Sequence, residues 1–361
     1  MSRAGTVGRV VAGSSIAAAA AGVGLVLDRR RRRSVPDDPQ PFGDLRGDVH
    51  TVTTDDGLLL HAEVDEMAPY GTAANHDDRA TVVFVHGFSL TLDCWHFQRL
   101  AFRGKRRMVF YDQRSHGRSG RAEKGSATID QLGRDLFTVL EALAPDEPVV
   151  LVGHSMGGMS IVALAEQHPE LFGDRVVGVA LVSTTAGGQR THKMLSKYIP
   201  DAVGRRVVER GLLLAAERER VLELVRRSGS AVALRVIEEF AFGDEPVPRS
   251  YVRFLDSMIS ATPLQVLVEF IPQFDALDKF HVVAAFAQVP TWVMCGTKDR
   301  LTSIGHARKL HARIPGSHLV EFRGGGHMSL LEHKDEVNDT LDLLFEDADR
   351  LLADGLMADG A

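Results

Sequence analysis

The sequence predicts an α/β fold, a mostly parallel eight-stranded sheet with helices on both faces and a helical cap inserted into it. Apolar runs typical of buried strands recur along the chain, and helical patterns separate most of them. This alternation favours parallel strands joined by crossover helices. The stretch 188–285 contains periodic helical segments but no convincing buried strand, and it is therefore the predicted cap.

Residues 1–42 are predicted to be a hydrophobic, polybasic leader followed by a proline-rich linker. Residues 10–27 carry no charge, and Asp28 and five arginines follow them. Eighteen such residues barely suffice to cross a bilayer, and the arginines behind them would keep the following chain in the cytoplasm. The hypothesis is a cytoplasmic protein with membrane contact through residues 10–33. A disordered leader and a cleaved export signal are the alternatives.

Length, charge and cysteine content limit the number of domains and the classes of partner. With 361 residues, 44% of them hydrophobic, the chain can bury the core of one elaborated domain. Its net charge is −6, of which residues 1–33 contribute +6, and the remaining −12 argues against nucleic acid as a partner. Two cysteines, Cys94 and Cys295, provide neither a disulfide framework nor metal-ligand spacing. We expect no metal and no cofactor, and the oligomeric state stays open.

The core is predicted in two parts, residues 43–187 and 286–346, on either side of the cap. Residues 43–66 alternate around a turn at Asp55-Asp56-Gly57, which favours an antiparallel hairpin. Residues 347–361 are expected to form a fraying helix end and a tail. Helical patterns include 129–144 and 158–167, and the strand-like runs after the hairpin are 80–86, 107–111, 148–153, 176–183, 290–296 and 317–323.

Ser155 is the predicted nucleophile. The apolar run 148–152 leads directly into the pentapeptide Gly153-His154-Ser155-Met156-Gly157. A G-x-S-x-G motif at the end of a strand holds a serine on a sharp turn into a helix, and its glycines let neighbouring chain segments pass closely. An ordinary helix N-cap serine is the alternative.

A nucleophilic serine needs a base, and the base needs an orienting acid. Asp299 follows the strand-like run 291–295, and His327 follows the run 318–322 after three glycines. The order Ser155, Asp299, His327 is the one expected for a hydrolase built on a mostly parallel sheet. For the negative charge that develops during acyl transfer, the backbone N–H groups of Phe88 and Met156 are the expected oxyanion-hole donors.

These segments resemble the α/β-hydrolase family, over about residues 45 to 345. The matching segments are His86-Gly87-Phe88, Tyr111 to Ser119, Gly153 to Gly158, Gly296 to Asp299, and Gly326-His327 with Glu332. Ser115 stands where the family commonly has glycine. The resemblance implies a serine esterase or lipase-like enzyme, since the epoxide-hydrolase and dehalogenase branches use aspartate as nucleophile.

Several neighbouring residues are expected to support the site without taking part in the chemistry. His86 and His154 would shape it through hydrogen bonds, and Asp112 and Arg114 would tie a loop to the core. Glu332 is interpreted as a helix-start residue. Four apolar side chains of the cap are candidates for lining a substrate pocket, with packing of the cap on the body as the alternative: Phe240, Phe242, Phe254 and Met258.

The predicted function is hydrolysis of a small-molecule carboxylic ester through an acyl-serine intermediate. A lipid-like acyl ester is one of the substrates that this prediction includes. The resemblance leaves two related activities open, carbon–carbon bond hydrolysis and haloperoxidase- or perhydrolase-like chemistry. A ligand-binding protein on a hydrolase fold that has lost its activity is an alternative from a different class. Chain length, leaving group and stereochemistry of the substrate are not predicted.

Overall fold

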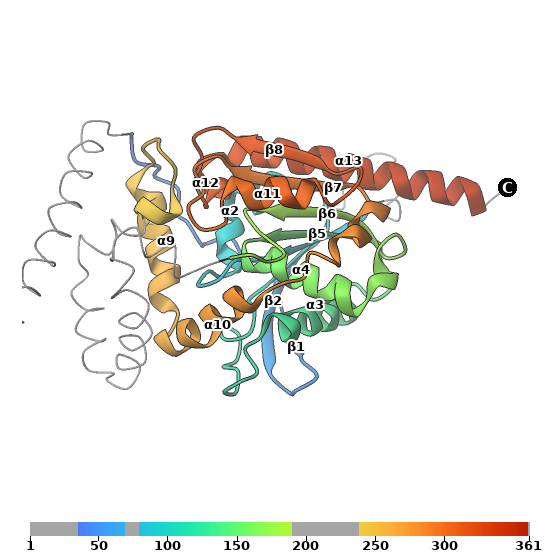
Figure 1. Cartoon of the computed structure of the whole chain (residues 1–361), viewed down its shortest axis with the longest axis horizontal. Coiled ribbons are helices and arrows are strands. Elements are labelled where there is room, and N and C mark those ends of the chain that lie inside the picture. Colours follow the sequence, from blue (N-terminus) through green and yellow to red (C-terminus); the bar gives the residue numbers. More distant parts are fainter. Residues whose placement is uncertain (1–34, 69–78, 190–237, 360–361) are drawn as a thin grey trace, which may run out of the picture.

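The computed structural model of the 361-residue chain describes residues 35–68, 79–189 and 238–359. Its centre is a single eight-stranded sheet with the strand order β1-β2-β4-β3-β5-β6-β7-β8 (Figure 1). Strand β2 runs antiparallel to both of its neighbours, and all later pairs are parallel. The strands are β1 (Asp48–Thr53), β2 (Leu59–Asp65), β3 (Thr81–Val85), β4 (Met108–Tyr111), β5 (Val149–His154), β6 (Val176–Val182), β7 (Thr291–Gly296) and β8 (His318–Phe322).

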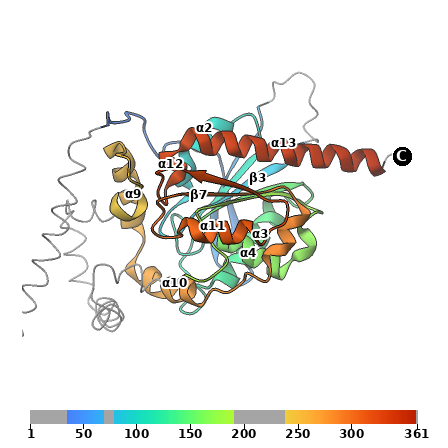
Figure 2. The ribbon, with the colours of Figure 1, turned by 45° about the horizontal axis from the view of Figure 1, so that its top comes forward.

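Helices cover both faces of this sheet. The α-helices are α2 (His96–Phe102), α3 (Ile129–Leu143), α4 (Met156–Gln167), α9 (Arg249–Ala261), α10 (Leu264–Ala276), α11 (Ile304–His311), α12 (Ser329–Glu332) and α13 (Lys334–Asp359). Short 3-10 helices add η2 (Leu92–Trp95), η3 (Pro169–Leu171) and η4 (Val283–Gln288). Figure 2 shows α2 and α13 on one side of the strands and α3, α4 and α11 on the other.

The alternation of side chains along the strands explains why two layers of helices are needed. Successive strand residues point to opposite faces. In β3, Val83 and Val85 therefore join the core cluster beneath α3 and α4, whereas Val82 and Phe84 join the cluster beneath α2 and α13. Every residue of β3, β4, β5 and β6 is buried, as expected for strands covered on both sides.

The predicted α/β sheet is confirmed, including its eight strands and the opening hairpin with its turn at residues 54–57. A fraying helix end and a tail were expected over residues 347–361. Helix α13 continues through most of this stretch, to Asp359. Its beginning still packs on the body, where Ala348 is buried and Asp349 pairs with Arg106 at 2.6 Å.

The described part of the predicted cap contains α9 and α10, which lie beside the end of the sheet where the parallel strands finish (Figure 1). The rest of the predicted cap, and residues 10–33 with their expected membrane contact, lie outside the described residues. Among the residues described, no single helix has the length and apolar character needed to cross a membrane; α9 and α10 meet that test only together, as a pair bent by 98°.

Candidate active site

Ser155 lies at the corner between β5 and α4, in backbone geometry that the surrounding chain imposes. Its φ of 52° and ψ of −115° are rare for a residue with a side chain. The corner is tight because β3 crosses behind it: a Cβ atom at Gly157 would lie 2.1 Å from the carbonyl oxygen of Val85. Only glycine fits at this position, and the strained turn presents the Ser155 hydroxyl at the end of β5.

The structure brings Ser155, His327 and Asp299 together in one chain of hydrogen bonds. His327 Nε2 lies 3.0 Å from Ser155 Oγ, and His327 Nδ1 lies 2.9 Å from Asp299 Oδ2. Asp299 follows β7, and His327 lies between β8 and α12, so three loops at the same edge of the sheet supply the three groups. Each distance permits a hydrogen bond. These are the three residues that the sequence order singled out.

The Asp299 carboxylate is buried but has several partners. Its Oδ1 accepts hydrogen bonds from the backbone N–H groups of Leu301 (2.8 Å) and Thr302 (2.9 Å), while its Oδ2 faces His327. Burial alone would raise the pKa of Asp299; His327 and the two N–H groups instead hold that pKa below its ordinary value. An ionised carboxylate beside the imidazole can orient it and stabilise its cationic form.

Thr302 is a further residue of this network that the sequence analysis did not find. Its hydroxyl lies 2.6 Å from the carbonyl oxygen of Ser183 and 2.9 Å from Asp299 Oδ2. Thr302 thereby connects the loop after β6 to the loop that carries the acid. No motif marks this threonine, because its partners come from distant parts of the chain.

Phe88 and Met156, the expected oxyanion donors, both lie beside Ser155. Met156 is the first residue of α4, where backbone N–H groups have no acceptor within the helix. On the other side, a Cβ atom at Gly87 would lie 3.1 Å from Ser155 Cβ, so the loop that contains Phe88 passes directly over the serine. The function of these two N–H groups stays a prediction.

Two buried histidines hold the loops of the site, as expected. His154 Nε2 lies 3.0 Å from the carbonyl oxygen of His327. His86 Nδ1 donates to the carbonyl oxygen of Gly87, and its Nε2 accepts from the backbone N–H of Gln113. Burial lowers the pKa of each of these two histidines to about 3, so both are neutral and bind as fixed hydrogen-bonding groups.

The expected role of Asp112 and Arg114 as a tie between loop and core is also observed. The Asp112 carboxylate accepts from the backbone N–H groups of Leu92 and Arg118, both at 2.8 Å. Arg114, fully buried, pairs with Asp135 at 2.6 Å. Ser115, directly after Arg114, has a φ of 67°, which is the left-handed conformation that explains why glycine suits this position.

Glu332, interpreted as a helix-start residue, lies in the first turn of the short helix α12 and is its last residue. Its carboxylate accepts from the backbone N–H of Gly326 at 2.8 Å and from that of Gly243 at 2.7 Å. Gly326 precedes His327, whereas Gly243 lies in the predicted cap stretch 188–285, shortly before α9. Glu332 thus joins the histidine loop to a segment about ninety residues away in the sequence, a contact that the sequence gives no means of predicting.

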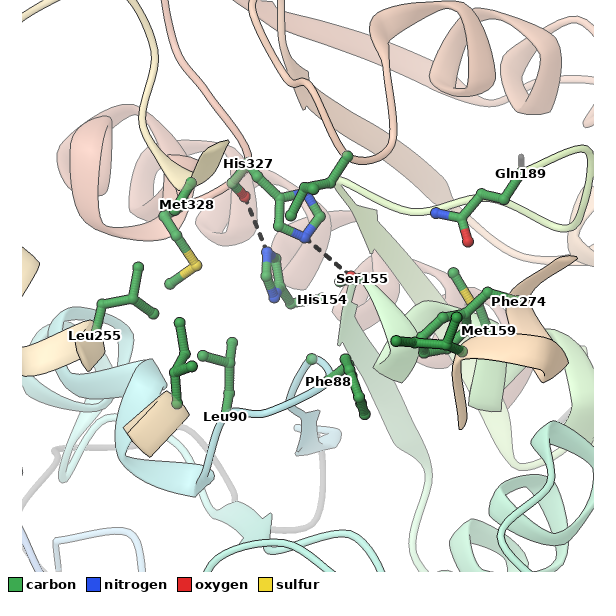
Figure 3. A pocket seen from close by; sticks show the side chains of 15 residues that line it. Phe88, Leu90, His154, Ser155, Met159, Gln189, Leu255, Phe274, His327 and Met328 are labelled. Atoms are coloured by element: carbon green, nitrogen blue, oxygen red, sulfur yellow. Dashed lines mark hydrogen bonds between the residues drawn. The ribbon is translucent and has the colours of Figure 1, made fainter. Parts of the chain in front are cut away.

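A cavity of about 190 Å³ opens beside Ser155 and His327 (Figure 3). Helix α9 contributes Leu255 and Ile259, and α10 contributes Ile271 and Phe274. The remaining side chains around it are mainly apolar, among them Phe88, Leu90, Met159, Leu301 and Met328. The cavity therefore suits the apolar part of a small molecule held at the Ser155 hydroxyl.

The four cap residues expected to line the pocket do not line this cavity, which corrects that expectation. Phe242, Phe254 and Met258 pack into the core cluster instead, and Phe240 is half-buried outside the lining. The reason is helical periodicity: Phe254 and Met258 share one face of α9, while Leu255 and Ile259, one position further along, share the face toward the cavity.

Nothing in the described part of the chain forms a cluster of three or more His, Cys, Asp or Glu side chains that could hold a metal ion. Cys94 and Cys295 are both free and buried. Cys295 Sγ lies 3.8 Å from Asp299 Oδ2, and burial, ahead of the nearby Asp299 charge, raises the pKa of this thiol above its ordinary value. Cys295 is therefore an uncharged packing neighbour of the acid.

Comparisons with known proteins agree with this architecture. An uncharacterised protein of Mycobacterium tuberculosis is 27% identical over 256 residues, which cover 68% of this chain and 69% of that protein. An esterase from Thermogutta terrifontis has a similar structure, with a TM-score of 0.64 and 22% identity, covering 83% of this chain and 98% of the esterase. A bromoperoxidase from Bacillus anthracis has the same TM-score at 20% identity, covering 83% of this chain and all of that one. Residues 82–340 match the model of the alpha/beta hydrolase family, and the chain belongs to that family.

Proposed function

We propose that this protein is a serine hydrolase that cleaves a small carboxylic ester through an acyl-serine intermediate. The observation that carries the proposal is the continuous hydrogen-bonded chain from Ser155 Oγ through the His327 ring to Asp299. A nucleophile, a base within hydrogen-bond distance of it and a group that orients the base are the parts that acyl transfer requires. The strained turn at Ser155 supports the same assignment.

In the first half of the reaction Ser155 Oγ attacks the ester carbonyl, and His327 Nε2 takes the hydroxyl proton. The carbonyl oxygen becomes negative and is stabilised by the N–H groups of Phe88 and Met156. As the tetrahedral intermediate collapses, the bond to the alcohol oxygen breaks and His327 returns its proton to that oxygen. The alcohol leaves, and the acyl group stays on Ser155.

Water completes the cycle by the same steps. His327 removes a proton from a water molecule as its oxygen attacks the acyl carbonyl, and then returns the proton to Ser155 Oγ, so that a carboxylic acid is released. Asp299 stabilises the imidazolium in both halves. The largely apolar cavity beside Ser155 supports this sequence because a low-dielectric wall strengthens the interactions of the charges that form.

The decisive test is the substitution Ser155→Ala. It should lower hydrolysis of p-nitrophenyl butyrate by about 10⁴-fold or more and abolish covalent labelling by a fluorophosphonate probe. The matched control is Ser317→Ala, because Ser317 lies on the loop before β8 and bonds only within that region. Labelling that survives Ser155→Ala, with the control fully active, would refute the assignment.

A further inference from the structure

Gln189 presents a buried polar atom to the cavity that the proposed chemistry does not use. It follows β6 and the loop that contains Ser183, and it is 9% exposed. Its Oε1 atom has no hydrogen-bond partner among the residues that the structure describes. Gln189 is nevertheless one of the residues lining the cavity, and Figure 3 shows its amide pointing into the space on the side of Phe274 and Met159.

The other described residues of the lining leave this amide oxygen unpaired. Among them, the polar side chains besides Gln189 are those of Ser155, His327 and His154. The first two bond to each other, and His154 turns its unpaired Nδ1 atom toward Gly87, where an added Cβ would lie 2.8 Å away. Met159 and Phe274 offer no hydrogen bond. A buried amide oxygen without a hydrogen bond is unfavourable, so a group that donates to Gln189 Oε1 gains binding energy there.

We propose that Gln189 binds a hydroxyl group of the substrate, so that the substrate class is a small hydroxy-substituted ester. This inference rests on the proposed function. A hydroxyl fits best because it can donate to the amide oxygen and, if the amide is turned over, accept from its nitrogen. A cavity of about 150 Å³ can hold a benzene molecule, so the volume of about 190 Å³ suits a substrate with a short chain.

The cavity also suggests how such an ester is oriented. Leu90, Leu255 and Met328 lie on one side of Ser155 and Gln189 on the other, as Figure 3 shows. An ester bound at Ser155 has two ends, the acyl chain and the alcohol. One end enters the wholly apolar side, and the end that carries the hydroxyl enters the side of Gln189. This arrangement rejects an ester with an apolar group in place of the hydroxyl, because Gln189 then stays unpaired.

Two matched pairs of substrates test the inference at both ends of the ester. On the alcohol side, 2-hydroxyethyl butyrate is compared with propyl butyrate; on the acyl side, methyl 3-hydroxybutyrate is compared with methyl 3-methylbutyrate. Each pair exchanges a hydroxyl for a methyl group of similar size. In the full-length protein, kcat/KM for the hydroxy ester should exceed that of its partner by about tenfold in at least one pair, as expected for one hydrogen bond to a buried group.

The variant Gln189→Leu should bring this ratio to one or below, because a leucine offers an apolar surface of similar size. Gln288→Leu is the matched control, an exposed glutamine at the end of η4, and should keep the ratio of the unmodified protein. Ratios near one in both pairs, with hydrolysis that still depends on Ser155, would overturn this inference and leave the proposed function standing. Absence of any Ser155-dependent hydrolysis would overturn both.

Discussion

At the residue scale, the two oxygens of the Asp299 carboxylate have different partners, and this division fixes the His327 tautomer. Oδ1 is occupied by the backbone N–H groups of Leu301 and Thr302, so only Oδ2 faces the ring. Oδ2 accepts a hydrogen bond from Nδ1 of His327, so Nδ1 carries the ring proton. Nε2 is then the acceptor for the hydrogen bond from the Ser155 hydroxyl. The acid thus acts by holding the imidazole in the form that can receive a proton.

Asp299→Asn should therefore lower kcat by about 10⁴-fold while the fold persists. The amide oxygen of the asparagine must stay with the two backbone N–H groups, so its NH₂ group faces His327. That group donates to Nδ1 and moves the ring proton to Nε2, where it blocks proton transfer from Ser155. Rates with p-nitrophenyl butyrate and a melting curve measure the effect. The exposed carboxylate of Asp339 on α13 gives the control Asp339→Asn, and a comparable, small loss in both variants would contradict the tautomer argument.

At the element scale, the segment 241–244 and the histidine loop 324–328 form one closely packed unit. The backbone N–H of Asp244 donates to Gly324, and that of Met328 donates to Ala241, at 3.0 and 2.8 Å. The two segments approach so closely that a Cβ atom at Gly243 would lie 1.8 Å from the Gly324 carbonyl oxygen. Glu332 completes the unit through its bonds to both segments. The position of His327 therefore depends on segment 241–244 of the predicted cap.

Glu332→Gln should lower kcat about tenfold and reduce the melting temperature, with a smaller change in KM. A carboxylate accepts from both N–H groups, whereas a glutamine has a single oxygen and would set its NH₂ group against the other N–H. One buried N–H then stays unpaired, which costs about 1–3 kcal/mol and loosens the loop before His327.

A neighbouring glutamate provides the control for this prediction. Glu336 pairs with His333 at 2.8 Å on an exposed turn, where an ion pair contributes about 0–1 kcal/mol. Glu336→Gln should leave kcat near that of the unmodified protein. The positioning role of Glu332 would be wrong if its glutamine variant matched the Glu336 variant in both kcat and melting temperature.

The strands of the sheet could be predicted from the sequence. A strand run such as 81–85, which is buried on both faces, can be recognised from its local sequence alone. Ser155, Asp299 and His327 could be singled out because each follows such a run. The residues that support them could not be predicted in this way. Glu332 contacts Gly243, and Gln189 lines the cavity, only in the folded chain. The expectation that Phe254 and Met258 line the pocket also failed for this reason, since the pattern of α9 shows its apolar faces but not which of them turns toward the cavity.

At the scale of the whole molecule, the fold buries titratable groups that it keeps neutral. Burial lowers the pKa of His86 and His154 to about 3 and that of His116 to about 4. In the unfolded chain a histidine titrates near 6.5. Below that pH the unfolded chain becomes protonated at these three histidines, whereas the folded protein keeps them neutral. The stability that these histidines contribute is complete above pH 6.5 and is lost as the pH falls toward 4.

Several buried carboxyl groups act in the opposite direction. Burial raises the pKa of Asp112 to about 6 and raises the pKa values of Asp135 and Glu332 above their ordinary range. The folded protein therefore takes up protons at these carboxyl groups before the unfolded chain does, which offsets part of the effect of the histidines. Each histidine that is protonated only in the unfolded chain near pH 5 contributes a slope of roughly 1.4 kcal/mol of unfolding free energy per pH unit. Urea titrations between pH 6 and pH 5 measure the net slope. They stay above the range in which carboxylates with lowered pKa values, such as Asp299, begin to contribute.

His116→Asn should lower that net slope by roughly 1.4 kcal/mol per pH unit. The asparagine side chain can keep the hydrogen bond that His116 Nδ1 makes to the Arg114 carbonyl oxygen at 2.9 Å, but it cannot take up a proton. Near pH 5 the unfolded chain of this variant then binds one proton fewer, while the folded protein is unchanged in this respect. His281→Asn is the control, because that ring is exposed on the surface. If the slope of the His116 variant equalled that of the control, burial of neutral histidines would not be the cause of the acid sensitivity, and the lowered pKa of His116 would be wrong.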